Sequence, residues 1–218
     1  MKKNISIIYK ILIVIIGIYG LYDSCFKPSK IGLLEHFSYY TNLSNLLCII
    51  FFIYYLIKYF TGENIENSRY YAVCKGSVTL VITITTIVYN FALRPFMYDV
   101  DGVMNLHSIG NYIVHIVLPL MVIFDYLIFD IKGKYKKNYP ILWLILPFIY
   151  WIFICIRAYV GKPFTYMESR YPYFFLDIDM FGLPQVLFNI LIIILGVFVL
   201  GLIYYKVDHL KTWAKNSN

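Results

Sequence analysis

The sequence predicts an all-α, polytopic membrane protein built as a bundle of six transmembrane helices, and three observations lead to this fold class. Of the 218 residues, 61% are hydrophobic and only 14% are charged, a balance that a soluble domain of this size does not tolerate. The charged residues fall mostly between long apolar runs, as expected when lipid solvates most of the surface. Each run is continuously apolar over about twenty residues, whereas the strands of a membrane β-barrel alternate apolar and polar residues over about ten.

Each predicted helix corresponds to one apolar run. The runs lie at about 5–22, 39–60, 72–93, 109–129, 141–159 and 183–205. The connections are short and rich in charged or turn residues, and prolines mark several helix starts or ends: Pro28, Pro95, Pro140 and Pro184. Because no connection is long enough for a second domain and no repeat of fixed period is visible, we expect residues 1–218 to form a single domain.

The first run, 5–22, follows the basic start MKKN and therefore has an alternative interpretation as a signal peptide. Two features favour a transmembrane helix instead. The run is longer than the roughly 7–15 apolar residues of a signal peptide. The stretch that follows, GIYGLYDSCF, contains no small-x-small cleavage site.

Lysine and arginine are distributed unequally between the two ends of the predicted bundle. Thirteen belong to the N-terminus, the second and fourth loops, the C-terminus and the flanking helix ends: Lys2, Lys3, Lys10, Lys58, Arg69, Lys75, Lys132, Lys134, Lys136, Lys137, Lys206, Lys211 and Lys215. Six belong to the opposite side: Lys27, Lys30, Arg94, Arg157, Lys162 and Arg170. The positive-inside rule then predicts cytoplasmic N- and C-termini, and the membrane that we expect is the plasma membrane. This bias accounts for most of the net charge of +7, so we expect contacts with membrane lipids and no nucleic-acid partner.

Polar residues lie along one face of the second, third and fourth helices, toward the end that this orientation turns outward. Their spacings of three and four place those of each helix on one face. They are Ser38, Thr41, Asn42 and Asn45 in the second helix; Thr79, Thr83, Thr86 and Asn90 in the third, which ends near Arg94; and His107 or Ser108, Asn111 and His115 in the fourth. Arg157 adds a charge near the outer end of the fifth helix, and Gln185 and Asn189 open the sixth.

The inner half of the helices is nearly all Ile, Leu, Val and Phe. The exception is Asp125, which we interpret as a local polar contact, with a proton relay as the alternative. This asymmetry predicts a polar cavity that opens outward or into the outer leaflet and is closed toward the cytoplasm. It disfavours a channel that is polar from end to end, and the broken helices and repeats typical of transporters are not visible.

Thr41 and His115 have the elements of nucleophilic catalysis: a hydroxyl nucleophile, and an imidazole that can take the hydroxyl proton and return it to a leaving group. Asn45, one turn from Thr41, is placed to donate to a developing oxyanion, and Asn111, one turn from His115, to contact the imidazole ring. Asn90 and Ser38 are further candidates for supporting the oxyanion.

The helices supply no carboxylate as a third catalytic member, so Asp177 or Asp179 of the fifth loop would have to fold back onto the histidine. Each polar residue also has a structural interpretation, because threonine in a membrane helix usually bonds to the carbonyl one turn earlier and a lone buried histidine is more often structural. Four residues are candidate substrate contacts: Arg94, Arg157, Gln185 and Asn189. For the two arginines the favoured interpretation is that of interfacial anchors that snorkel outward.

Two motifs resemble the androgen-induced integral membrane protein family. They are YYTNLSN around Thr41 and NYIVHIVLP, which contains Asn111, His115 and Pro119. Members of that family are six-pass threonine hydrolases of fatty acid esters of hydroxy fatty acids, with a threonine and a histidine in these two motif positions. The resemblance implies that Thr41 is the nucleophile and His115 its base. The fifth-loop stretch RYPYFFLD is more similar to uncharacterised bacterial six-pass relatives than to the animal enzymes.

We therefore expect a lipid ester hydrolase that requires no metal and no organic cofactor. Hydrolysis and acyl transfer both stay open, because water or another hydroxyl can resolve a threonyl acyl-enzyme. The richness in Ile, Lys, Asn and Tyr is typical of an AT-rich bacterial genome, so a different membrane lipid ester is a second candidate for the natural substrate. The alternative is a transporter or lipid-binding protein in which Thr41 and His115 contact a solute in an outward-facing cavity.

Overall fold

The structure is a computed structural model that describes residues 2–27, 32–97, 106–165 and 167–216. These residues are helices joined by turns and loops, with no strand among them, which confirms the predicted all-α class. Six helices in this part of the chain are long and apolar enough to cross a membrane: Lys3–Cys25, Tyr40–Phe60, Arg69–Leu93, Ile109–Phe129, Tyr139–Val160 and Ile178–Leu210. They coincide with the six predicted runs and extend several of them at one or both ends.

Several spans are composed of consecutive helical segments of different type. In chain order the elements are α1 (Lys2–Cys25), α2 (Leu33–His36), α3 (Tyr40–Phe60), α4 (Arg69–Ile87), η1 (Val88–Leu93), η2 (Arg94–Phe96), α5 (Ile109–Tyr112), η3 (Ile113–Val117), α6 (Leu118–Phe129), α7 (Tyr139–Leu142), α8 (Ile145–Val160), η4 (Phe174–Leu176) and α9 (Ile178–Asn216). The segments η1 and η3 are π-helices, and both interrupt a span in its predicted outer half.

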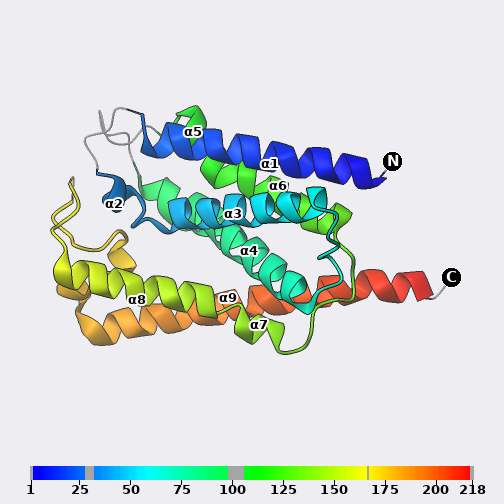
Figure 1. Cartoon of the computed structure of the whole chain (residues 1–218). Coiled ribbons are helices and arrows are strands. Elements are labelled where there is room, and N and C mark those ends of the chain that lie inside the picture. The colour runs from blue at the N-terminus through cyan, green and yellow to red at the C-terminus, as the bar shows by residue number, and fades with distance from the viewer. Residues whose placement is uncertain (1, 28–31, 98–105, 166, 217–218) are drawn as a thin grey trace.

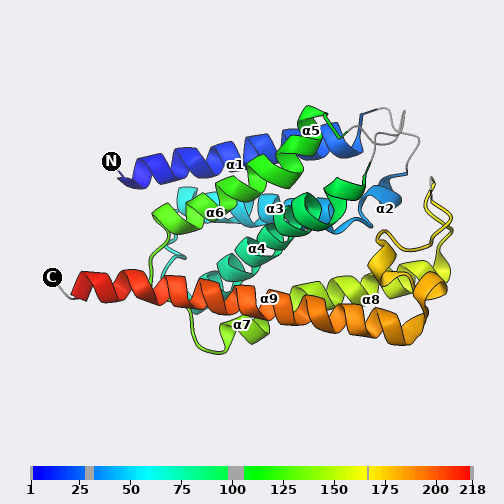
Figure 2. The same cartoon turned by 180° about the vertical axis from the view of Figure 1, so that it is seen from behind.

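Helix α4 occupies the middle of the bundle. It crosses obliquely between a group formed by α1, α3 and α6 and a pair formed by α8 and α9 (Figures 1 and 2). Its threonines bond to carbonyls one turn earlier, with Thr79 Oγ1 at 2.8 Å from Lys75 O and Thr83 Oγ1 at 2.7 Å from Thr79 O. Back-bonding satisfies hydroxyls that hydrocarbon neighbours cannot, so a polar stripe is compatible with burial.

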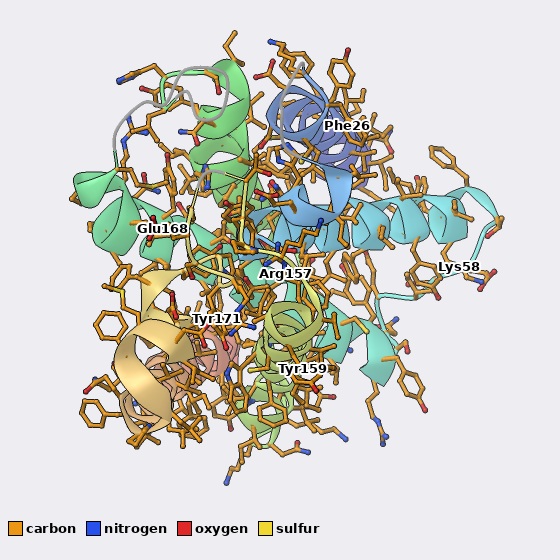
Figure 3. The ribbon with its side chains drawn as sticks, turned by 90° about the vertical axis from the view of Figure 1, so that its left-hand side faces the viewer. Phe26, Lys58, Arg157, Tyr159, Glu168 and Tyr171 are labelled. Atoms are coloured by element: carbon orange, nitrogen blue, oxygen red, sulfur yellow. The ribbon has the colours of Figure 1, made fainter. Side chains whose placement is uncertain are left out.

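The N- and C-termini lie at the same end of the bundle (Figure 1). The other end carries α2 and the segment between α8 and α9, and we call residues 161–177 the fifth loop. Figure 3 looks onto that end, where Arg157, Tyr171 and Glu168 are seen among the side chains of the fifth loop and its neighbours. The cytoplasmic location of the termini stays a prediction.

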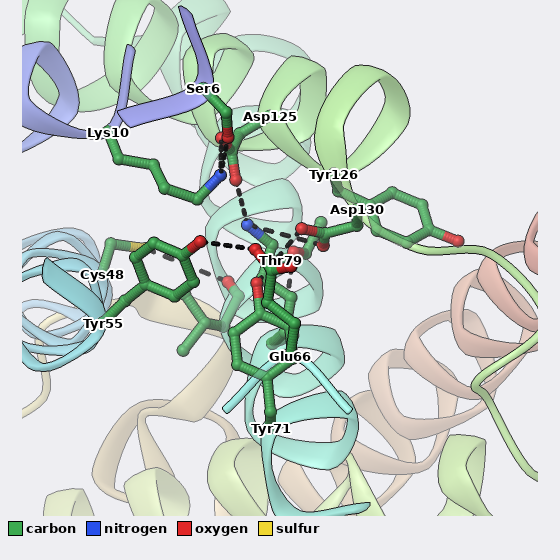
Figure 4. A network of polar contacts seen from close by, with 12 residues as sticks. Ser6, Lys10, Cys48, Tyr55, Glu66, Tyr71, Thr79, Asp125, Tyr126 and Asp130 are labelled. Carbon is green, nitrogen blue, oxygen red and sulfur yellow. Dashed lines mark hydrogen bonds and ion pairs between the residues drawn. The ribbon is translucent and has the colours of Figure 1, made fainter. Parts of the chain in front are cut away.

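The predicted inner half is not uniformly apolar. Lys10 of α1, Lys75 of α4 and Asp125 of α6 meet there, each with at most 1% of its side chain exposed (Figure 4). Lys10 Nζ lies 2.8 Å from Asp125 Oδ1, Lys75 pairs with Asp125 Oδ2, and Lys75 Nζ lies 3.6 Å from Asp130 Oδ2. Asp125 does make a local polar contact, and its partners are two lysines that were counted among the loops and flanking helix ends of the predicted cytoplasmic side. Mutual neutralisation allows these charges to be buried.

Candidate active site

The structure brings Thr41 and His115 together from helices that are far apart in the sequence. Thr41 is the second residue of α3, and His115 is the central residue of the π-helix η3. Thr41 Oγ1 lies 3.2 Å from His115 Nε2, within hydrogen-bonding distance. His115 is 9% exposed, so the pair is largely shielded from solvent.

The backbone determines which nitrogen of His115 carries the proton. His115 Nδ1 lies 3.0 Å from the backbone oxygen of Asn111. A carbonyl oxygen only accepts hydrogen bonds, so Nδ1 must be the protonated nitrogen and Nε2 must present its lone pair. The Thr41 hydroxyl then donates to Nε2, which is the arrangement that a general base requires.

A backbone carbonyl therefore holds the position that a third carboxylate has in other catalytic sites. Neither predicted carboxylate folds back onto the histidine. Asp177 accepts from the Ser169 hydroxyl at 2.5 Å and from Met180 N–H at 2.9 Å. Asp179 pairs with Arg170 at 2.7 Å on the surface.

Both π-helical segments contribute a ring to the site. The Tyr89 ring of η1 stacks on the His115 ring of η3, with 3.4 Å between ring centroids and 15° between ring planes. The Asn90 side-chain amide donates to the backbone oxygens of Thr86, at 2.8 Å, and of His115, at 3.3 Å. A π-turn displaces the helical hydrogen-bond pattern by one residue and so turns side chains to new directions, and such turns are frequent at functional sites.

The Tyr89 hydroxyl connects the stacked ring to two further predicted residues. It accepts from Asn111 Nδ2 at 2.7 Å and from Arg94 Nη1 at 3.5 Å. Arg94 also donates to the backbone oxygen of Leu106 at 3.2 Å. Asn111 thus contacts the histidine through its backbone and not through its side chain, and Arg94 reaches the site only through Tyr89.

The remaining predicted supporting residues bond to the protein backbone. Asn45 Nδ2 donates to the backbone oxygens of Thr41, at 2.7 Å, and of Val114, at 3.0 Å, which ties α3 to η3. The Ser38 hydroxyl donates to the backbone oxygen of Leu34 at 2.9 Å. These contacts position the dyad, and a role for either residue at an oxyanion stays a prediction.

Three candidate substrate contacts hold the fifth loop in place. Arg157 Nη1 donates to the backbone oxygen of Arg170 at 2.8 Å. Asn189 Nδ2 donates to the backbone oxygen of Phe175 at 3.0 Å, and Gln185 bonds to Asn189 at 3.0 Å. These bonds connect α8 and α9 to the fifth loop.

A cavity with about 790 Å³ of free space, its open side included, adjoins Thr41. Its walls come from α3, α4, η1, α8, α9 and the fifth loop, and they are mostly aliphatic and aromatic, including Val88, Trp151 and Ile193. The predicted cavity was polar, and the structure corrects this. The hydroxyls and amides of the predicted polar faces are largely used in bonds within the protein, so what adjoins Thr41 is a space suited to hydrocarbon.

Tyr89 and Tyr173 belong to the site but were not predicted from the sequence. Tyr173 belongs to the fifth-loop stretch RYPYFFLD, and its ring lines the cavity beside Thr41. Its hydroxyl oxygen accepts from the backbone N–H of Tyr40, the residue before Thr41, at 3.1 Å. Burial raises the pKa of the Tyr173 phenol to about 12, so the phenol stays protonated at neutral pH. The density of aromatic residues in this short loop was the available signal.

Comparison of the chain with protein-family models, with curated proteins and with solved structures gives no match.

Proposed function

We propose that the protein is a membrane-embedded hydrolase of lipid esters, with Thr41 as the nucleophile and His115 as the base. One observation carries the proposal. The backbone oxygen of Asn111 directs the lone pair of His115 Nε2 at the Thr41 hydroxyl, 3.2 Å away. A hydroxyl held against an unprotonated imidazole nitrogen is an activated nucleophile, and here it faces a cavity suited to an acyl chain.

The chemistry follows from these positions. Thr41 Oγ1 forms a bond to the ester carbonyl carbon while its proton moves to His115 Nε2, and the carbonyl electron pair moves onto the carbonyl oxygen. When that pair returns, the bond to the alcohol oxygen breaks and Nε2 gives its proton to the leaving alcohol. Water repeats the sequence on the acyl-threonine, with His115 as base and then acid, and releases the fatty acid.

The cavity supports a long-chain substrate. Burial of hydrocarbon contributes roughly 0.8 kcal/mol per methylene, so an apolar space of this size selects for chain length. Fatty acid esters of hydroxy fatty acids, which the two motifs imply, fit this description, and so do other membrane lipid esters. The proposed location is the plasma membrane with cytoplasmic termini, which would place the dyad in the outer half.

The test is ester hydrolysis by the purified protein in detergent. Long-chain p-nitrophenyl esters and a hydroxy-fatty-acid ester are compared in wild type, Thr41→Ala and His115→Ala. We expect both variants to lose about 10³-fold or more in kcat. Thr79→Ala is the matched control, because it removes a buried threonine hydroxyl that bonds only to its own helix, and it should keep wild-type kcat.

A fluorophosphonate probe gives a second readout that does not depend on finding the natural substrate. The probe should label wild type at Thr41 and leave Thr41→Ala unlabelled. If wild type hydrolyses no ester at any chain length and is not labelled, the hydrolase proposal falls. Thr41 and His115 would then be contacts of a transporter or lipid-binding protein.

A further inference from the structure

We infer that Tyr173 is a catalytic residue whose phenol O–H stabilises the oxyanion formed when Thr41 attacks an ester. The inference rests on the proposed function and adds to it the group that the chemical step still lacks. Negative charge develops on the carbonyl oxygen in the transition state, and a donor fixed beside that oxygen is usually a large contribution to catalysis. Tyr173 comes from the fifth loop, outside both motifs.

Tyr173 lies beside Thr41 at the cavity. Tyr173 and Thr41 line the same cavity, and the backbone N–H of Tyr40, the residue before Thr41, holds the Tyr173 hydroxyl oxygen at 3.1 Å. A carbonyl carbon that approaches Thr41 Oγ1 from the cavity brings its oxygen to this hydroxyl. The ring itself is held by stacking on Phe175, with 5.3 Å between ring centroids and 1° between ring planes.

The hydrogen bonds around Tyr173 leave its own O–H available as a donor. The backbone N–H of Tyr40 donates to Tyr173 Oη, so this oxygen is already an acceptor. The hydroxyl of Tyr150, which also lines the cavity, donates to the backbone oxygen of Ser38 at 3.0 Å. The Thr41 proton points to His115. Because the bond from Tyr40 N–H uses Tyr173 Oη as an acceptor, the O–H of Tyr173 is available to donate to an oxygen in the cavity.

Nucleophilic attack provides a strong acceptor for that proton. Once Thr41 Oγ1 is bonded to the carbonyl carbon it is a poor acceptor, whereas the adjacent oxyanion is a strong one. The phenol donates a hydrogen bond and keeps its proton, so the proton transfers between Thr41, His115 and the leaving group are unchanged. The bond from Tyr40 N–H, in the first turn of α3, polarises the phenol and makes it a stronger donor.

The predicted amide donors are less available. Both N–H groups of the Asn45 side chain are used by backbone oxygens. The side-chain amide of Asn111 donates to Tyr89 and to the backbone oxygen of Leu106. Either amide would have to give up a buried hydrogen bond to reach an oxyanion, which costs free energy that the Tyr173 phenol does not lose.

The experiment compares Tyr173→Phe with Tyr171→Phe. Both rings belong to the fifth loop, and the control loses the same hydroxyl group from a buried ring that does not line the cavity. We expect Tyr173→Phe to lower kcat by about 10²- to 10³-fold with KM nearly unchanged, since the lost bond exists only in the transition state. Tyr171→Phe should keep wild-type kcat.

A pair of inhibitors separates a catalytic role from an anchoring role. A long-chain trifluoromethyl ketone adds to Thr41 and presents a tetrahedral oxygen to Tyr173, whereas an ether of equal length has no such oxygen. Tyr173→Phe should weaken the ketone by the same factor as kcat/KM and leave the ether unchanged. Equal weakening of both inhibitors would show that Tyr173 only anchors the loop, and it would overturn the inference.

Failure of this inference is distinguishable from failure of the proposed function. If wild type is active and Thr41→Ala is not, but Tyr173→Phe keeps wild-type kcat, the oxyanion role of Tyr173 is overturned and the hydrolase proposal stands. If wild type neither hydrolyses esters nor binds the ketone, both are overturned. Should Tyr173→Phe not fold, 3-fluorotyrosine at this position keeps ring and hydroxyl, and kcat should then change with the acidity of the phenol; an unchanged kcat would contradict the inference.

Discussion

Replacing Asp125 by asparagine should destabilise the protein more than a single polar substitution usually does. The Asp125 carboxylate neutralises Lys10 through one oxygen and Lys75 through the other, and all three side chains are at most 1% exposed. An asparagine of the same size keeps the shape and removes the charge, which leaves buried ammonium groups without their common counterion. Removing one partner from a buried ion pair costs about 3–5 kcal/mol.

Thermal unfolding in detergent measures this loss. For a chain of this size about 1 kcal/mol corresponds to about 2–4 °C, so Asp125→Asn should lower Tm by about 6–20 °C. Asp179→Asn is the matched control, because the Arg170–Asp179 pair lies on the surface and solvent screens it. If the two variants have the same Tm, the reasoning about the buried charges is refuted.

Two further predictions concern the ends of the bundle. Burial raises the pKa of Asp130, which directly follows α6, from 3.8 to about 6. The folded state therefore holds this proton more tightly than the unfolded state, and ionisation of Asp130 lowers the free energy of unfolding as pH rises between these two values. Asp130→Asn should remove this decline, so Tm should differ less between these two pH values in the variant than in wild type. An equal difference in both proteins would contradict the prediction. At the other end, Ile193→Trp should fill the cavity and shift the preferred ester to shorter chains while Thr41 still reacts with the fluorophosphonate probe, and unchanged chain-length selectivity would show that the acyl chain lies elsewhere.

Hydropathy was sufficient to predict the helices, and helical spacing was sufficient to place Thr41 and His115 on polar faces. Both follow from local rules, because a run of apolar residues and a period of 3.6 can be read from a single segment. The polar faces of Thr41 and His115 meet only because α3 and η3 pack against each other, which no single segment determines. The motif resemblance implied a shared role for the two residues, but neither motif indicates the 3.2 Å contact between them.

The π-helices at Val88–Leu93 and Ile113–Val117 could not be predicted in the same way. A π-turn leaves no distinctive residue pattern, and its stability comes from contacts with neighbouring elements. The stacking of Tyr89 on His115 therefore had no signal in either segment. Tyr173 was missed for a related reason: a loop has no period that shows where its side chains point.

The burial of Lys10 and Lys75 was not predicted, because each charge was considered without its partner. A lysine near the end of an apolar run is usually at the membrane surface, and that expectation holds when no partner is present. Here the partner, Asp125, lies more than a hundred residues from Lys10 in the sequence. One sequence does not contain the information that these residues are paired, although an isolated aspartate in an apolar run is already evidence that a cation lies nearby.

The hydrogen bond from His115 Nδ1 to the backbone oxygen of Asn111 has a consequence for how this site tolerates mutation. Every amino acid has a backbone carbonyl, so no side-chain replacement at position 111 deletes the acceptor that sets the histidine tautomer. A chain with another residue at that position would therefore keep this acceptor for the histidine. A search for three invariant side chains would overlook such a protein, because the third group that contacts the histidine is a backbone oxygen and not a side chain.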